Sequence, residues 1–251
     1  MTAADMLESL SREAHVWYCD PRAIIESERL AQYQAVLSEE ERSQLNRFHF
    51  KNDQHNYLVS HALLRNALSK YADIHPEAWV FEAGAHGKPG LAPGLANAPL
   101  EFNLTHTDGM CACVITRDVV CGIDVEQQAR NNTLLAIAQR MFAPAEVAAL
   151  KNTADAALRP TFFRFWTLRE AYLKALGSGL GGSSKAFHFE ITDSGSSRYA
   201  TASIRFDDSQ LAGSADAWQF EVFLHESDHV LATALHTRGT PRTLRWRFMR
   251  P

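Results

Sequence analysis

The chain has 251 residues, of which 46% are hydrophobic and 22% charged, and its formal net charge is −4 at neutral pH. These values are ordinary for a globular protein with a sizeable core, folded as one large domain or two small ones. The mild charge excludes a general electrostatic attraction to nucleic acid or to an anionic membrane, and no apolar run is long enough to span a membrane.

The N-terminal stretch MTAADMLESLSRE contains acids and no apolar segment, which argues against a secretory signal. The cysteines form no CxxC pair and have apolar, strand-like neighbours, which is typical of buried, reduced thiols. They are Cys19, Cys111, Cys113 and Cys121. The sequence therefore predicts a cytoplasmic protein.

The first half of the chain is predicted to mix strands and helices. Pro21 opens a helical stretch, because proline suits the first helical turn. Ser38 and Glu41 form a capping-box pattern at the start of another helix. The segment rich in glycine and proline at 84–99 is expected to be a loop. The expected order is strand 15–20, helix 21–37, a helical region from 38 through 57–68, and strands 79–83, 101–106 and 110–116.

The second half repeats this mixture. Its expected order is strand 119–126, helices at 133–142, from Pro144 and from Pro160 to a glycine cap at Gly177, and strands 186–192, 199–206, 218–225 and 229–236. Hairpins outnumber strand–helix–strand units, which favours the α+β class with antiparallel sheets.

Two acids stand at the end of an apolar strand in GIDVE, residues 122 to 126. Side chains at i and i+2 of a strand point the same way, ~6–7 Å apart, so Asp124 and Glu126 would aim at one spot. Like charges there repel unless a cation or a donor lies between them. The alternative is a strand that simply emerges into solvent, and the pair alone supports both readings equally.

The stretch FWTLREAYLKALGSGL (165–180) carries a second polar pair. On a helix, Trp166, Glu170 and Lys174 recur every four residues and share a face. A surface ion pair beside core aromatics is one interpretation. The other is a carboxylate and an ammonium aimed into one pocket, which explains better why the pair shares a face with tryptophan.

Polar side chains also occur in HGKPGL (86–91) and FNLTH (102–106). Lys88 lies in a loop stiffened by proline, and Thr105 and His106 end a strand. Alone, His106 is more typical of a structural or exposed histidine. Together, an ammonium, a hydroxyl and an imidazole suit the binding of phosphate oxygens.

Taken in order, FNLTHT, GIDVE and FWTLREAYLKALGSGL resemble the three signature stretches of 4′-phosphopantetheinyl transferases. HGKP resembles a fourth, shorter element of the larger, single-chain surfactin-type branch, which the length also matches. The resemblance covers roughly residues 38 to 182, and the ordered set is far more specific than any single motif.

The resemblance implies a magnesium-dependent holo-[carrier protein] synthase. Such an enzyme transfers the phosphopantetheine arm of coenzyme A to a serine of an apo-acyl or peptidyl carrier protein and releases adenosine 3′,5′-bisphosphate. The fold implied is two pseudo-symmetric α+β halves, each an antiparallel sheet packed with helices, with the active site at their interface. We expect the halves at 1–118, with the coenzyme-binding motifs, and 119–251, with the metal-binding motifs. We also expect a monomer that binds neither nucleic acid nor a membrane.

The resemblance also implies roles by motif position. Asp124, Glu126 and Glu170 would bind Mg²⁺ at the pyrophosphate, and the catalytic set would be Asp124, Glu170 and Lys174. The coenzyme would be bound by Lys88, Thr105, His106 and Lys174, with Thr105 and His106 near its 3′-phosphate. The chemistry agrees, because Mg²⁺ takes one or two carboxylates together with substrate phosphates and waters. The serine proton would go to Glu170 or to a metal-bound water.

The chain departs from the family pattern in several places. Arg169 stands where lysine is usual, and Thr105 replaces the commoner serine. The family usually has an arginine near the positions of Asn56 or His61, towards the adenine end of the coenzyme. Arg47, Lys51 or Arg65 are candidate substitutes, and we keep Arg47 in the binding set.

Two other functions compete with this one. HESDH (225–229) matches the zinc-hydrolase pattern HExxH through His225 and His229, but it lies between strand-like runs rather than on a helix. The second is a non-catalytic homologue that only binds carrier protein. The role of the arginine-rich tail at 237–251 is a separate question: it is either a solvated end or a docking aid for an acidic carrier protein.

Overall fold

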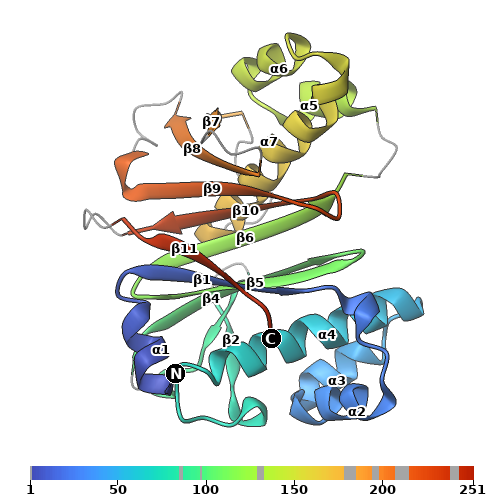
Figure 1. The fold of residues 1–251 in the computed structure, drawn as a ribbon, viewed down its shortest axis with the longest axis vertical. Helices are drawn as coiled ribbons and strands as arrows, with labels where there is room; N and C mark the ends of the chain where they lie inside the picture. The colour runs from blue at the N-terminus through green and yellow to red at the C-terminus, as the bar shows by residue number, and fades with distance from the viewer. Residues whose placement is uncertain are drawn as a thin grey trace. The chain divides into compact units, whose positions relative to one another are not determined.

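The computed structural model describes residues 2–84, 87–96, 98–128, 133–177, 185–193, 198–206, 215–237 and 243–251. It confirms the α+β class (Figure 1). The chain forms two compact units, the first made of residues 1–121 with 243–251 and the second of residues 122–242. Within the described residues, no helix is both long and apolar enough to cross a bilayer.

The first unit holds a four-stranded sheet in the order β11-β1-β5-β4 and a two-stranded ribbon of β2 and β3. Strand β5 runs antiparallel to β1 and β4, whereas β11 runs parallel to β1. Its elements are α1 Ala3–Ser9, β1 Glu13–Cys19, η1 Pro21–Ala23, α2 Ser27–Val36, α3 Glu39–Leu45, α4 Lys51–Leu68, η2 Pro76–Ala78, β2 Phe81–Ala83, β3 Pro89–Leu91, β4 Leu100–Thr107, β5 Met110–Arg117 and β11 Arg245–Met249.

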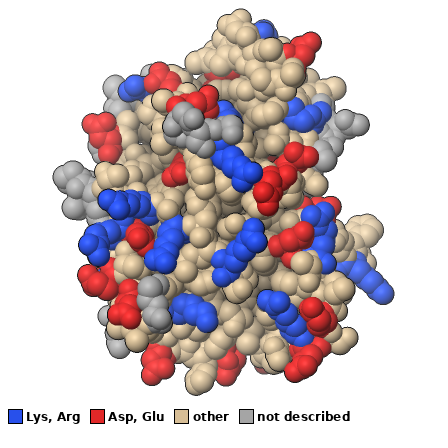
Figure 2. Space-filling view, viewed as in Figure 1, with Lys and Arg blue, Asp and Glu red and all other residues tan. Residues whose placement is uncertain are grey.

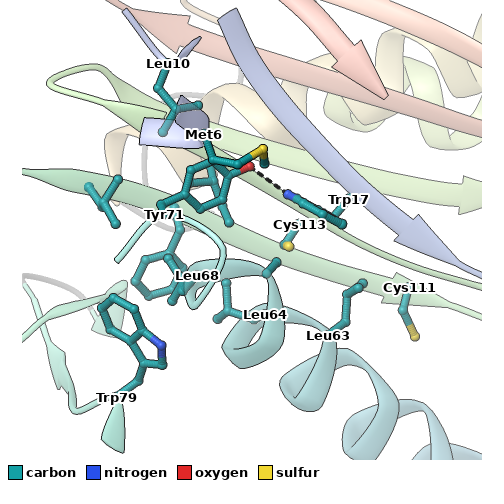
Figure 3. Packing of buried hydrophobic residues seen from close by; sticks show 14 of the residues in the cluster. Met6, Leu10, Trp17, Leu63, Leu64, Leu68, Tyr71, Trp79, Cys111 and Cys113 are labelled. Atoms are coloured by element: carbon teal, nitrogen blue, oxygen red, sulfur yellow. Dashed lines mark hydrogen bonds between the residues drawn. The ribbon is translucent and has the colours of Figure 1, made fainter. Parts of the chain in front are cut away.

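The core of the first unit lies between its sheet and helix α4 (Figure 3). Leu63, Leu64 and Leu68 of α4 pack against Trp17 of β1 and the buried face of β5. The indole of Trp17 donates a hydrogen bond of 2.8 Å to the hydroxyl of Tyr71, which follows α4. Burial of this large apolar set fixes α4 across the sheet.

The second unit holds a five-stranded sheet in the order β6-β10-β9-β8-β7. The pairs from β10 to β7 are antiparallel, and the long helix α7 crosses one face (Figure 1). Tyr172 of α7 packs edge-on against Phe187 and Trp218 of that face, with ring centroids 4.8 Å away in both cases. The elements are β6 Val120–Gln127, α5 Leu134–Met141, α6 Pro144–Lys151, α7 Asp155–Leu176, β7 Phe187–Asp193, β8 Tyr199–Phe206, η5 Ala215–Ala217, β9 Trp218–His225 and β10 His229–His236.

Two of the predicted helix ends are confirmed. The backbone N–H of Glu41 donates to the Ser38 hydroxyl at 3.2 Å, and the N–H of Ser38 donates to the Glu41 carboxylate at 2.9 Å. Gly177 adopts φ 68° and donates its N–H to the Leu173 carbonyl at 3.0 Å. These local signals were readable because each depends on residues within one helical turn.

Other boundaries were predicted wrongly. Pro21 opens only a short 3-10 turn, and the next helix begins at Ser27. Helix α7 begins at Asp155, so Pro160 lies inside it rather than at its start. The segment 84–99 contains the short strand β3.

The arginine-rich tail contains a strand. β11 pairs with β1 from Glu13↔Arg245 to Trp17↔Met249, so the last residues belong to the first unit and not to the second half as expected. Its docking role stays a prediction.

On the face drawn in Figure 2, basic and acidic side chains are intermixed, as expected for 25 basic and 29 acidic residues.

Candidate active site

Strand β6 lies directly against helix α7, and a glycine makes this possible. A Cβ added to Gly122 would lie 2.6 Å from the Ala175 amide nitrogen and closer still to the Ala171 carbonyl oxygen. Side chains essentially never approach a backbone so closely. The glycine of GIDVE and the two alanines of α7 therefore allow close backbone contact between the two signature stretches.

The close approach brings Asp124 of β6 to Lys174 of α7. The Lys174 Nζ donates to Asp124 Oδ1 at 2.7 Å and to the Ile123 carbonyl at 3.2 Å. The Asp124 side chain is only 9% exposed, whereas that of Lys174 is 32% exposed. Asp124 is thus a buried carboxylate paired with a partly accessible ammonium, whereas the sequence had paired Lys174 with Glu170.

Glu170 lies one helical turn before Lys174 and is half-buried. Burial is the main cause that raises the pKa of its carboxyl, and the negative charges of Asp124 and Glu126 raise this pKa further. The positive charge of Lys174 lowers it in part. The three carboxylates are therefore close enough to repel one another. A cation at this place would relieve that repulsion.

The donor chemistry of these acids fits magnesium. No cluster of three or more ligating side chains is already assembled among the described residues. Magnesium does not need one, because it usually takes one or two carboxylates and completes its octahedron with waters and substrate phosphates. Asp124, Glu126 and Glu170 supply oxygen ligands of the right kind.

The first unit holds the other predicted residues. The Lys88 Nζ donates to the Cys121 carbonyl at 3.0 Å, at the start of the GIDVE strand. His86 of HGKP lies outside the described residues. His106 is exposed near the end of β4, while Thr105 is buried. Successive strand residues point to opposite faces, so these two side chains do not lie on the same face of the sheet.

A cavity of 780 Å³ adjoins this end of the first sheet, and His106 lines it. Its aromatic wall is formed by Tyr57, Trp79, Phe81 and Phe102. Arg47 is not among its lining residues and instead borders a neighbouring hollow of 620 Å³, which shares Tyr57, Glu40 and Glu41 with it. The volume of the first cavity is typical of small-molecule sites, about 300–1,000 Å³.

His61 and Arg65, whose positions the resemblance places towards the adenine end of the coenzyme, both contact Glu41 in this cavity. Glu41 accepts hydrogen bonds from His61 Nδ1 at 2.9 Å and from Arg65 Nε at 2.8 Å. The sequence identified Glu41 as a helix cap only. Residues 41 and 61 belong to different helices, and no local spacing signals such a contact.

Arg169, the residue in place of the usual lysine, forms its ion pair with Glu146. It donates to Glu146 at 2.7 Å, and its guanidinium lies 4.3 Å from the ring centroid of Phe187. Glu146 also accepts from the backbone N–H groups of Ala143 and Phe189. This buried pair ties α7 to the start of α6 and to β7.

The zinc-hydrolase pattern lacks the helix that it requires. His225 and His229 are paired residues of the β9–β10 hairpin, and the Ser227 hydroxyl lies 2.6 Å and 2.9 Å from their Nδ1 atoms. A hairpin does not present i and i+4 side chains as one helical face does. The structure therefore argues against HESDH as a zinc-hydrolase motif.

Comparison with known proteins agrees with the ordered motifs. Residues 120–234 match the family model of the 4′-phosphopantetheinyl transferase superfamily, and residues 25–117 match that of the 4′-phosphopantetheinyl transferase N-terminal region. The 4′-phosphopantetheinyl transferase HetI of Nostoc sp. is 34% identical over 174 residues, 69% of this chain and 73% of the relative.

Two further relatives carry similar names. A putative 4′-phosphopantetheinyl transferase of Synechocystis sp. is 30% identical over 68% of this chain and 67% of its own length. The 4′-phosphopantetheinyl transferase Sfp of Bacillus subtilis is 27% identical over 62% and 67%. The chain belongs to the 4′-phosphopantetheinyl transferase superfamily, which includes the surfactin-type members.

Proposed function

We propose that the protein transfers the 4′-phosphopantetheine arm of coenzyme A to a serine of an apo-carrier protein, giving holo-carrier protein and adenosine 3′,5′-bisphosphate. One observation carries the proposal most directly. The 2.7 Å contact between Asp124 and Lys174 joins two of the ordered signature stretches at one polar site. Membership of the superfamily supports the same reaction.

The transfer is a displacement at phosphorus. The serine Oγ attacks the phosphorus that bears the pantetheine arm, a new Oγ–P bond forms, and the bond from that phosphorus to the bridging pyrophosphate oxygen breaks. Adenosine 3′,5′-bisphosphate leaves with the bridging oxygen. Such a reaction needs alignment and charge neutralisation more than covalent help from the enzyme.

We assign Asp124, Glu126 and Glu170 as ligands of Mg²⁺. The ion, when bound, would neutralise the pyrophosphate and the charge that develops on the leaving oxygen. Lys174 is held by Asp124 and by the Ile123 carbonyl, so its ammonium is oriented towards the same phosphates. Glu170 is our candidate to accept the serine proton, and a metal-bound water is the alternative.

We assign Arg47, Lys88 and His106 to the remaining coenzyme contacts, because their charges suit phosphate oxygens. His106 lines the large cavity of the first unit. Thr105 stays a prediction, because its side chain is buried and lies on the other face of the sheet from that of His106. The cytoplasm is the location we propose, because the four cysteines are present as thiols rather than disulfides. A monomeric state, and the absence of nucleic-acid or membrane partners, stay predictions.

The decisive experiment incubates the protein with coenzyme A, Mg²⁺ and a panel of apo-acyl and apo-peptidyl carrier proteins. Mass spectrometry of the carriers should show the added mass of the phosphopantetheine arm, and Asp124→Asn should abolish it. Carrier binding without any mass gain would favour the non-catalytic alternative. Failure of every carrier both to bind and to gain mass would contradict the proposed function.

A further inference from the structure

Two cysteines face each other across the first sheet. Cys19 of β1 and Cys111 of β5 are directly opposed residues of an antiparallel pair of strands. Opposed residues of such a pair project from the same face of the sheet, and their Cα atoms lie about 4.5 or 5.5 Å apart. Both values fall within the range of about 4.4–6.8 Å that a disulfide spans. The register therefore places the two thiols where a bond can form without any change in strand pairing.

The two thiols differ in their access to solvent. Cys111 is fully buried in the core cluster that faces α4 (Figure 3), whereas Cys19 is half-buried at the border of that cluster. Hydrogen bonding with Cys19 is the largest cause that raises the pKa of Cys111, and burial raises this pKa further. Cys111 is thus a protonated thiol next to Cys19, and Cys19 is the one of the two that a small oxidant in solvent reaches.

The other two cysteines lack this arrangement. Cys113 lies two residues further along β5 and is opposed by Trp17, and Cys121 belongs to strand β6 of the other sheet. Both are fully buried, and burial raises the pKa of each thiol. They are inert by comparison, because oxidation of a thiol requires access and thiolate character. Cys113 therefore serves as a matched control for the opposed pair.

The opposed cysteines lie beside residues that line the large cavity of the first unit. His106 of β4 opposes Cys111 from the other side of β5, so Cys19, Cys111 and His106 form a row across three strands on one face of the sheet. Cys111 Sγ also donates to the carbonyl of Asn56 in α4 at 3.6 Å. The next residue of α4, Tyr57, lines the cavity, as His106 does. A change at Cys111 therefore acts on two sides of this cavity.

We propose that Cys19 and Cys111 form a reversible disulfide, and that this modification weakens the binding of coenzyme A. The effect on binding rests on the proposed function, whereas the bond itself does not. The oxidant is a hydroperoxide. With hydrogen peroxide, the Cys19 sulfur takes one oxygen and becomes a sulfenic acid, and one water leaves. The Cys111 sulfur then displaces the sulfenic hydroxyl, its proton leaves with that group as a second water, and the S–S bond forms.

The bond would change the surroundings of Cys111 in two ways. A disulfide has no S–H, so the donor to the Asn56 carbonyl is lost. Its sulfur atoms lie about 2.05 Å apart, closer than two thiols in contact, so the ends of β1 and β5 are drawn together. The ladder transmits this shift to His106. A thiol reductant reverses the bond by thiol–disulfide exchange.

The test treats the protein with hydrogen peroxide, unfolds it in iodoacetamide and maps disulfides by mass spectrometry of unreduced peptides. The proteins are the parent, Cys19→Ser and Cys113→Ala. We expect a bond between residues 19 and 111 in the parent and in Cys113→Ala, and none in Cys19→Ser. In calorimetry, oxidation should weaken coenzyme A binding about tenfold in the first two proteins and leave it unchanged in Cys19→Ser. Dithiothreitol should restore the affinity.

Several results would overturn the proposal. One is that peroxide leaves both thiols open to iodoacetamide, or converts Cys19 to a sulfinic acid or to a disulfide between two molecules. Another is a loss of affinity in Cys19→Ser as large as in the parent. A mapped bond between Cys19 and Cys111 with unchanged affinity would overturn its effect on coenzyme binding.

The mapping separates this proposal from the proposed function. It needs neither a variant nor turnover, so the bond is tested in the parent even if Cys19→Ser folds poorly. A reduced parent that neither binds coenzyme A nor modifies a carrier would overturn the proposed function, and the effect on binding with it. The presence or absence of the disulfide would still decide whether Cys19 and Cys111 are a modification site.

Discussion

At the residue scale, the acids and the lysine of the second unit are not equivalent for stability. Asp124 is paired with Lys174, so its charge is compensated. Glu170 is held near two other carboxylates, and burial with their charges raises its pKa. The charge of Asp124 thus contributes favourably to the apo-protein, while that of Glu170 opposes folding.

We predict that Glu170→Gln and Asp124→Asn both reduce carrier turnover by about 100-fold or more, with opposite effects on stability. Without metal at pH 7.5, the Tm of Glu170→Gln should equal or exceed that of the parent, because a repelled charge is removed. The Tm of Asp124→Asn should fall, because Lys174 loses its partner. Calorimetric unfolding and a carrier mass assay check both. Equal stability losses would mean that Glu170 is a structural carboxylate.

Gly122 is the second residue on which the site depends. We predict that Gly122→Ala destabilises the protein by about 2 kcal/mol or more and lowers turnover, because the new Cβ collides with α7 backbone atoms that yield only if β6 moves. Gly90→Ala is the matched control, since an added Cβ there meets nothing within 4 Å. Urea unfolding of the two variants gives the comparison. A Gly122→Ala protein as stable as Gly90→Ala would refute the close approach.

At the element scale, helix α7 has two functional sides. One side presents Glu170 and Lys174, and the other buries Arg169 against Glu146. Burial raises the pKa of Glu146, against the opposing charge of Arg169 and hydrogen bonds from Phe189 and Ala143. We expect the Glu146–Arg169 pair to remain ionised, because the carboxylate accepts hydrogen bonds from three donors.

We predict that Glu146→Ala lowers the free energy of unfolding by about 3–5 kcal/mol, because it leaves the Arg169 guanidinium buried without its counter-ion. The KM for coenzyme A should change little in whatever fraction stays folded. Arg205→Ala serves as the control: its pair with Glu190 is more than half exposed, so the loss should be below about 1 kcal/mol. If chemical denaturation showed equal losses of unfolding free energy for Glu146→Ala and Arg205→Ala, the buried pair would stabilise the protein no more than the exposed pair does.

At the scale of the whole molecule, stability should depend on pH through the sheet of the second unit. Glu221 of β9 faces Thr233 and Thr201 on the neighbouring strands, and burial raises its pKa from 4.5 to about 7. Between these pH values the folded protein binds a proton that the unfolded chain has released. Stability from this residue is therefore complete below pH 4.5 and is lost as pH rises through 7.

We predict that Glu221→Gln is more stable than the parent at pH 8, and that its advantage shrinks as the pH falls towards 4.5. Between pH 8 and pH 4.5, the difference in unfolding free energy between the two proteins should change by about 1–2 kcal/mol. This is less than the full pKa shift implies, because the side chain is partly solvated. Thermal unfolding of both proteins at matched ionic strength across this range measures it. A difference that is independent of pH would mean that Glu221 titrates normally.

Motifs that depend on near neighbours in the chain were predictable from the sequence. The Ser38–Glu41 cap, the Gly177 helix end and the shared face of Glu170 and Lys174 each lie within a few residues of chain. Local backbone geometry determines such contacts. The α+β class and most strands also followed from the sequence, because burial imposes periodicity on the order of residues.

Contacts between distant segments were decided only by the tertiary structure. The Asp124–Lys174 bond requires α7 to lie on β6, and the pairing of β11 with β1 turns an apparent tail into part of the first sheet. The contact between His61 and Glu41 likewise joins residues of two different helices. Packing determines these contacts because a buried charge or strand edge must find its partner in space, wherever that partner lies in the chain.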